Sequence, residues 1–301
     1  MDWWEGLKSC IIHKIADAFY LLIYSSIYLS IAGASMVYIS CTMQHMPYSP
    51  SLLAIMFLAT FSVYNINRKT DEKEDAINHS DRFSFTSRYG KVLSTSAILA
   101  YILAIALAVR YGVKTALISA IPLICGILYS ITWLPEKFKY RRLKEIPFVK
   151  NLVVAFAWAS TPTLLPVYSN SSNVAVAALV VVIFFFTLVF INSVIFDLRD
   201  TEGDAASGVK TIPVVFGVRR TIIFLACLNL LFGLVDLFLC SAYLSSKFTC
   251  LLAAGMVYAV FYIFSFEKVK RINLLCDAVA DGQFLIFGSL LYIITELEPT
   301  S

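Results

Sequence analysis

Nine long apolar runs account for most of this 301-residue chain. A helix needs about 20 consecutive apolar residues to cross the hydrocarbon core of a bilayer, and each run is close to that length. Charged residues make up only 15% of the chain, against roughly 25% in a typical soluble domain. The sequence therefore predicts an all-α integral membrane protein with nine transmembrane helices, at residues 16–43, 49–66, 91–110, 114–133, 149–168, 174–197, 220–243, 248–266 and 272–295.

These spans leave room for one membrane domain, residues 1–301, and for no separate soluble domain. Residues 1–14 precede the first span and mix Trp3, Trp4 and Leu7 with charged residues. We expect this segment to lie at the membrane interface as an amphipathic helix, the alternative being a frayed tail.

The positions of the basic residues predict how the chain crosses the membrane. Assigned to the nearest tail or connection, 21 of the 24 Lys and Arg residues fall on one side of a nine-span arrangement and 3 on the other. Because basic connections stay in the cytoplasm, this asymmetry predicts a cytoplasmic N-terminus. It also puts three long connections, residues 67–90, 134–149 and 198–219, on the cytoplasmic face.

An acidic motif follows directly on the second span. Asn67, Asp71 and Asp75 are spaced four residues apart, so a helix would bring all three onto one face. Carboxylate and amide oxygens are ligands that suit a hard cation such as Mg²⁺. The spacing therefore predicts a metal-binding face at the mouth of this span.

A second acidic motif stands in the same relation to the sixth span. Asp197, Asp200 and Asp204 again share a helical face, and Asn192 lies one to two turns earlier. So much negative charge beside a membrane is unfavourable unless cations offset it. The alternative is that either cluster consists of ordinary charges in a solvated loop.

Two acidic clusters on one face favour a single split site. Asp71 and Asp200 are 129 residues apart, and so are Asp75 and Asp204, which indicates two repeats of four spans followed by a ninth. Facing clusters of this kind could hold two Mg²⁺ ions with a diphosphate between them.

Basic residues near the clusters could neutralise such a diphosphate and stabilise it as it leaves. Arg82 and Lys210 lie close in sequence to the two clusters, and Lys144 and Lys150 belong to a connection dense in cations. We expect Lys144 and Lys150 in particular to have this role. The alternative is topological, because cytoplasmic connections are basic in any case.

A further acidic pair, Asp277 and Asp281, opens the ninth span with the same four-residue spacing. These two residues could join a polar cavity or simply end a helix near the lipid headgroups. We interpret them as helix-end charges.

Both acidic motifs resemble the signatures of a known family. Asn67-xxx-Asp71-xxx-Asp75 resembles the first signature of the UbiA superfamily of intramembrane prenyltransferases, and the stretch from Asp197 to Pro213 resembles the second. The match in order, spacing and span placement covers nearly the whole chain. The resemblance implies a nine-helix fold around a central cavity, Mg²⁺-dependent binding of a prenyl diphosphate, and transfer of the prenyl group to a lipid or quinone precursor.

The resemblance also implies roles for individual residues. Those that would bind Mg²⁺ and diphosphate are Asn67, Asp71, Asp75, Asp197, Asp200 and Asp204. Tyr140 and Lys144 resemble the family's Tyr-xxx-Lys element, and Tyr129 is the alternative tyrosine. Many members carry an Arg-Pro-Leu segment after the first signature, whereas this chain reads Asn78-His-Ser-Asp-Arg82-Phe-Ser and retains only the arginine.

We therefore predict that the protein transfers a prenyl group from a polyprenyl diphosphate to an aromatic quinone precursor or a lipid. The three cytoplasmic connections would be its catalytic loops. The predicted catalytic residues are Asp71, Asp75, Asp200, Asp204, Tyr140 and Lys144. The predicted diphosphate-binding residues are Asn67, Arg82, Lys144, Lys150, Asn192 and Lys210. We expect no nucleic-acid partner.

Two other classes of function remain open. One is an ion-coupled transporter that uses the acidic clusters, and the other is a non-catalytic membrane protein that binds prenyl lipids. A transporter predicts acids near the middle of the membrane, whereas these clusters lie at one face.

Overall fold

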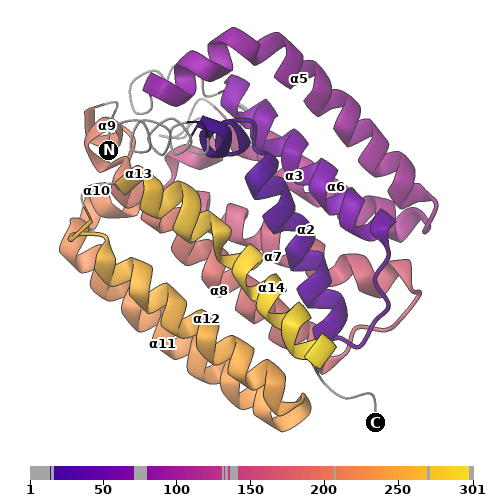
Figure 1. Cartoon of the computed structure of the whole chain (residues 1–301). Helices are drawn as coiled ribbons and strands as arrows, with labels where there is room; N and C mark the ends of the chain where they lie inside the picture. The colour runs from indigo at the N-terminus through magenta and orange to yellow at the C-terminus, as the bar shows by residue number, and fades with distance from the viewer. Residues whose placement is uncertain are drawn as a thin grey trace, which may run out of the picture.

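The computed structural model describes residues 14, 17–70, 80–130, 132, 135, 142–206, 208–269 and 272–297, which form a bundle of helices (Figure 1). No strand occurs in this described part of the chain, in agreement with the predicted all-α class. The long helices are α2 (Ile27–Met43), α3 (Pro50–Thr70), α5 (Ser80–Val109), α6 (Val113–Ser130), α7 (Val149–Ser169), α8 (Val176–Arg199), α11 (Val218–Tyr243) and α12 (Ser246–Ser265). A broken helix follows, made of α13 (Ile272–Leu274), a π-helix (Leu275–Ala280) and α14 (Asp281–Leu297). The shorter elements are a 3₁₀ helix (Leu143–Glu145), α9 (Thr201–Ala206) and α10 (Ile212–Phe216).

Seven helices within the described ranges are long and apolar enough to cross a membrane: α3, α5, α7, α8, α11, α12 and the broken helix from Ile272 to Thr295. The segment Asp17–Tyr24 and α2 form an eighth candidate that is bent by 65°, and α6 is a shorter apolar helix. Each of the nine predicted runs therefore contains a helix within the described residues, and the chain is a multi-pass membrane protein. Nine crossings and the four-plus-four-plus-one arrangement stay predictions.

The first span is bent around Ser25, and the end of α3 supports the bend. The Asn65 side chain donates a hydrogen bond to the Ser25 carbonyl (3.1 Å). The Arg68 guanidinium donates to the Ile23 carbonyl (3.1 Å) and to that of Tyr24. Carbonyl groups freed by a bend inside a bilayer need such donors, because lipid supplies none.

Helices α3 and α5 extend further than the apolar pattern predicts. Helix α3 continues to Thr70, and α5 begins at Ser80, well before the predicted span. The added turns are largely polar, so hydropathy alone does not mark them as helix. As a result Asn67 and Arg82, within the connection predicted at residues 67–90, both lie on helices, as the spacing of the first acidic motif requires for Asn67.

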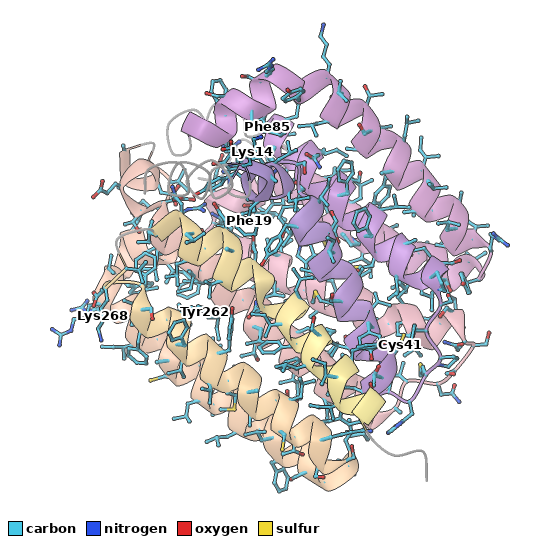
Figure 2. All side chains as sticks on the ribbon, in the orientation of Figure 1. Lys14, Phe19, Cys41, Phe85, Tyr262 and Lys268 are labelled. Atoms are coloured by element: carbon cyan, nitrogen blue, oxygen red, sulfur yellow. The ribbon has the colours of Figure 1, made fainter. Side chains whose placement is uncertain are left out.

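Helices α7 and α8 are the most buried of the candidate spans and form the middle of the bundle. In Figure 1, α11 and α12 lie together at one edge and α5 lies at the opposite edge. Large side chains fill the core, among them Phe185 on α8, Tyr262 on α12 and Phe287 on α14. Figure 2 shows Tyr262 inside the bundle and Lys268 at its edge. The apolar core thus leaves the ends of the central helices to build a site.

We predict that Gly33→Ala destabilises the bundle by about 1–3 kcal/mol. Gly33 on α2 lies so close to α3 that an added Cβ would stand 2.3 Å from Oγ1 of the buried Thr60. The matched control is Gly90→Ala on α5, where an added Cβ meets nothing within 4 Å and where alanine is the better helix former. Thermal unfolding in detergent measures both variants. Equal midpoints for the two would contradict the close approach of α2 and α3.

Candidate active site

A cavity of about 270 Å³ lies among α2, α3, α5, α6, α7, α8 and the broken helix. Six of the predicted site residues line it: Asn67, Arg82, Lys150, Asn192, Asp197 and Asp200. Residues of both acidic motifs, which are far apart in sequence, therefore meet at one cavity. The split-site hypothesis requires this arrangement.

The other predicted residues divide into two groups. Those outside the described residues are Asp71, Asp75, Tyr140 and the side chain of Lys144. Asp204 and Lys210 are described but do not line the cavity, and Lys210 is exposed. Helix α9 and a turn at Gly208 (φ 76°) separate Lys210 from α8, so its closeness in sequence does not bring it to the cavity.

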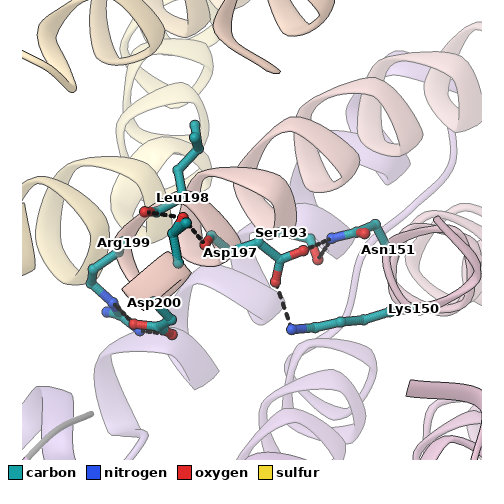
Figure 3. A network of polar contacts seen from close by, with 8 residues as sticks. Lys150, Asn151, Ser193, Asp197, Leu198, Arg199 and Asp200 are labelled. Carbon is teal, nitrogen blue, oxygen red and sulfur yellow. Dashed lines mark hydrogen bonds and ion pairs between the residues drawn. The ribbon is translucent and has the colours of Figure 1, made fainter. Parts of the chain in front are cut away.

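Asp197 is held by two residues at the start of α7. Lys150 Nζ donates to its Oδ1 (2.5 Å) and Asn151 Nδ2 donates to its Oδ2 (2.9 Å), while the carboxylate is 1% exposed (Figure 3). Asn151 Nδ2 also donates to Ser193 Oγ (2.9 Å). Because both carboxylate oxygens already accept hydrogen bonds, Asp197 fixes the position of Lys150 at the cavity. The spacing of the second acidic motif predicted Asp197 as a metal ligand and did not predict its contact with Lys150.

Asp200 ends α8 and pairs with the neighbouring Arg199. The guanidinium binds in a bidentate manner, with Nε donating to Oδ1 (2.8 Å) and Nη2 donating to Oδ2 (3.1 Å) (Figure 3). Its Nη1 donates to Asp277 Oδ1 (2.8 Å), and the Phe196 ring centroid lies 4.6 Å from the guanidinium carbon. The Arg199 side chain is only 4% exposed, so a buried cation links α8 to the broken helix.

Asp277 and Asp281 both line the cavity, which corrects their interpretation as helix-end charges. Asp281 Oδ1 accepts a hydrogen bond from Asn192 Nδ2 (3.0 Å), and Asp277 accepts one from Arg199. Asp277 belongs to the π-helix and Asp281 follows it, and π-helical turns recur at functional sites. Their four-residue spacing, shared with the first acidic motif, was the signal that could have found them.

Asp204 lies beyond Asp200 on α9. Burial raises the pKa of Asp204 to about 6; the carboxylates of Asp197 and Asp200 also raise it, and the Lys150 ammonium opposes them. Three carboxylates therefore lie near the end of α8, two of them paired with Lys150 and Arg199. A divalent cation would offset the repulsion that remains among them.

The oxygen atoms at the cavity are of the types that Mg²⁺ prefers as ligands. Asp200 offers a carboxylate, and Asn67 and Asn192 offer amide carbonyls, which are hard ligands. Asn192 Oδ1 is buried and accepts no hydrogen bond from the described residues, so it is available to a cation. Within the same ranges, no three acidic, His or Cys side chains stand close enough together to hold a metal ion. The described residues thus suit Mg²⁺ but do not form a complete ligand set.

Beyond the charged residues the cavity wall is apolar and aromatic. The rings of Tyr64 and Trp158 stack with their centroids 5.5 Å apart, and both line the cavity. Tyr129, the alternative to Tyr140 for the Tyr-xxx-Lys element, lines it as well. An apolar wall beside a charged rim fits an amphiphilic molecule with an anionic head.

Comparison with known sequences points to one family. A sequence model of the UbiA prenyltransferase family matches residues 27–278. A digeranylgeranylglyceryl phosphate synthase of Pyrococcus abyssi is 28% identical over 184 residues, which are 60% of this chain and 60% of that protein. A synthase of the same name from Natronomonas pharaonis is 30% identical over 170 residues, 55% of this chain and 56% of that protein. The chain thus matches about 60% or less of the length of these relatives.

Solved structures of similar fold cover most of the chain. A UbiA homologue from Archaeoglobus fulgidus, bound to GPP and Mg²⁺, has a TM-score of 0.67 at 16% identity and covers 90% of this chain and 98% of its own. The apo structure of a UbiA homologue from Aeropyrum pernix K1 has a TM-score of 0.65 at 16% identity. The match covers 90% of this chain and 99% of that chain. Similarity at this identity establishes the fold.

Proposed function

This chain belongs to the UbiA prenyltransferase family, and we propose that it transfers a prenyl group from a prenyl diphosphate to a lipid acceptor in an Mg²⁺-dependent reaction. The observation that carries the proposal is the cavity itself, where Asn67 of the first motif and Asp197 and Asp200 of the second lie beside basic residues and an apolar, aromatic wall. A prenyl diphosphate has the matching shape, with a multiply charged head and an apolar chain. The N-terminus and the charged rim would face the cytoplasm, as the distribution of basic residues predicts.

Two Mg²⁺ ions would bind at the charged rim. Their proposed ligands are Asn67, Asp71, Asp75, Asn192, Asp200 and Asp204. When bound, Mg²⁺ supplies positive charge that stabilises the departing diphosphate. Lys150 and Arg82, which line the same cavity, would bind the diphosphate oxygens. The Asp197 carboxylate would keep Lys150 in position for this contact.

The prenyl chain would lie along the apolar wall. As the bond between the allylic carbon and the diphosphate oxygen breaks, positive charge develops on that carbon. The ring faces of Tyr64 and Trp158 can stabilise such a charge. An acceptor hydroxyl then bonds to the carbon and its proton passes to the departing diphosphate, while the buried site keeps competing water away.

We favour a lipid acceptor over an aromatic quinone precursor because the similar sequences are named digeranylgeranylglyceryl phosphate synthase. Their names describe a lipid with a glyceryl phosphate head. An acceptor of that class has a hydroxyl group as nucleophile, an anionic head for the rim, and apolar chains for the bilayer.

The test is to incubate the purified protein in lipid nanodiscs with labelled prenyl diphosphates, Mg²⁺ and a panel of acceptors. We expect labelled product with a prenylated glyceryl phosphate and none when a chelator removes Mg²⁺. Product only with hydroxybenzoate or a naphthoate would contradict the lipid acceptor. Binding of the donor without release of diphosphate would favour a non-catalytic lipid-binding protein, and Mg²⁺-dependent flux across liposomes without product would favour a transporter.

A further inference from the structure

From the contacts of Arg199 we infer that Asp277 is a positioning residue. It retains the buried Arg199 guanidinium when Asp200 exchanges that partner for a divalent cation. This inference rests on the proposed function, because it assumes that Asp200 is a metal ligand.

The guanidinium lies between two carboxylates. It occupies both oxygens of Asp200, at 2.8 and 3.1 Å, and reaches Asp277 Oδ1 at 2.8 Å with its third nitrogen. An arginine in this position competes with a metal ion for Asp200, because both need the same carboxylate oxygens. Cation binding at Asp200 must therefore break or weaken the bidentate pair.

Release from Asp200 would be costly for an arginine with no second anion in contact. The Arg199 side chain is 4% exposed, so little water reaches it to replace the lost hydrogen bonds. A buried charge that loses its partner is strongly destabilising. Asp277 avoids this outcome, since its 2.8 Å contact uses a different guanidinium nitrogen and can persist after Asp200 has turned to the cation.

The fold holds Asp277 in place through a second contact between the same helices. Asn192 and Arg199 are seven residues, or about two turns, apart on α8. Asn192 binds Asp281 and Arg199 binds Asp277, so α8 and the broken helix are joined at two levels. These paired contacts keep Asp277 beside Arg199 irrespective of what Asp200 binds.

The prediction is a weaker affinity for Mg²⁺ when the Asp277 carboxylate is removed. Without it, the Arg199–Asp200 pair loses its competitor and is harder for the cation to displace. We expect Asp277→Asn to raise the Mg²⁺ concentration for half-maximal thermal stabilisation by about tenfold, the effect of one charge-assisted contact. The experiment titrates the purified full-length protein with MgCl₂ alone and follows the unfolding midpoint, so no turnover is needed.

A double-mutant cycle separates this role from a general effect of negative charge. In an Arg199→Gln background, Asp277→Asn should change the half-maximal Mg²⁺ concentration by no more than about twofold. A tenfold shift in both backgrounds would overturn the inference, because Asp277 would then act on the cation without Arg199. If Asp277→Asn does not fold, the pair Asp277→Glu and Asp277→Gln provides the same comparison, with the Glu variant expected to bind Mg²⁺ like the native protein.

Failure of the proposed metal site and failure of the Asp277 role give different results in these titrations. If the native protein and all variants show no stabilisation by Mg²⁺, the proposed metal site is wrong and this inference falls with it. If the native protein responds to Mg²⁺ and Asp277→Asn responds identically, only the role of Asp277 is wrong.

Discussion

Asp200→Asn is expected to reduce prenyl transfer by about 10³-fold while the protein stays folded. The amide keeps the size of the side chain but removes the negative charge that would hold Mg²⁺ beside the diphosphate. The fold should tolerate the change, since Asp200 lies at the end of α8 with its side chain 21% exposed, and Arg199 retains its contact with Asp277. The measurements are the rate of labelled product formation at saturating Mg²⁺ and the unfolding midpoint without Mg²⁺.

Glu202→Gln is the matched control for this variant. Glu202 lies on α9 two residues further along the chain, is exposed, and does not line the cavity. Its neutralisation removes one negative charge from the same face of the membrane without touching the site, so transfer should stay within about twofold of the native rate. Native-like transfer by Asp200→Asn would mean that the second acidic motif is not a metal site.

Most helices of this fold can be predicted from the sequence because the lipid environment constrains the backbone strongly. Every backbone polar group in the bilayer core must be satisfied within the chain, so a long apolar run has few alternatives to a helix. The predicted run at residues 149–168 and helix α7 (Val149–Ser169) nearly coincide for this reason. The extension of α5 back to Ser80 was missed because those turns lie outside the apolar pattern.

The sequence predicted several of the residues that lie at the site, but it did not predict which side chains contact each other there. Helical spacing and distribution of charge correctly brought Asn67 and Asp200 to one cavity. Nothing in the spacing shows that Asp197 pairs with Lys150, because that contact depends on how α7 packs against α8. The four-residue spacing of Asp277 and Asp281 hinted at a shared face, but a π-helix has no clear sequence signature, so the contact of Asp277 with Arg199 could not be predicted.

The contact between Lys150 and Asp197 is expected to contribute strongly to the stability of the fold. Lys150→Met should lower the free energy of unfolding by about 3–5 kcal/mol, because it leaves the Asp197 carboxylate without its cation. That carboxylate is 1% exposed and lies 2.5 Å from Lys150 Nζ, so water compensates for little of the loss. Methionine keeps an unbranched apolar side chain of similar length, which limits the change to the charge. Unfolding by denaturant in mixed detergent micelles measures the difference.

A double variant separates the stability of the site from its chemistry. Adding Asp197→Asn to Lys150→Met removes the unpaired buried charge, while the new amide can still accept a hydrogen bond from Asn151, the other partner of Asp197. Most of the lost stability should therefore return. Prenyl transfer should stay slow, because the cation proposed to bind the diphosphate is still missing. If the double variant regained both stability and transfer, Lys150 would be a structural partner of Asp197 alone, and the diphosphate would need its cations from elsewhere on the rim, with Arg82 the first candidate.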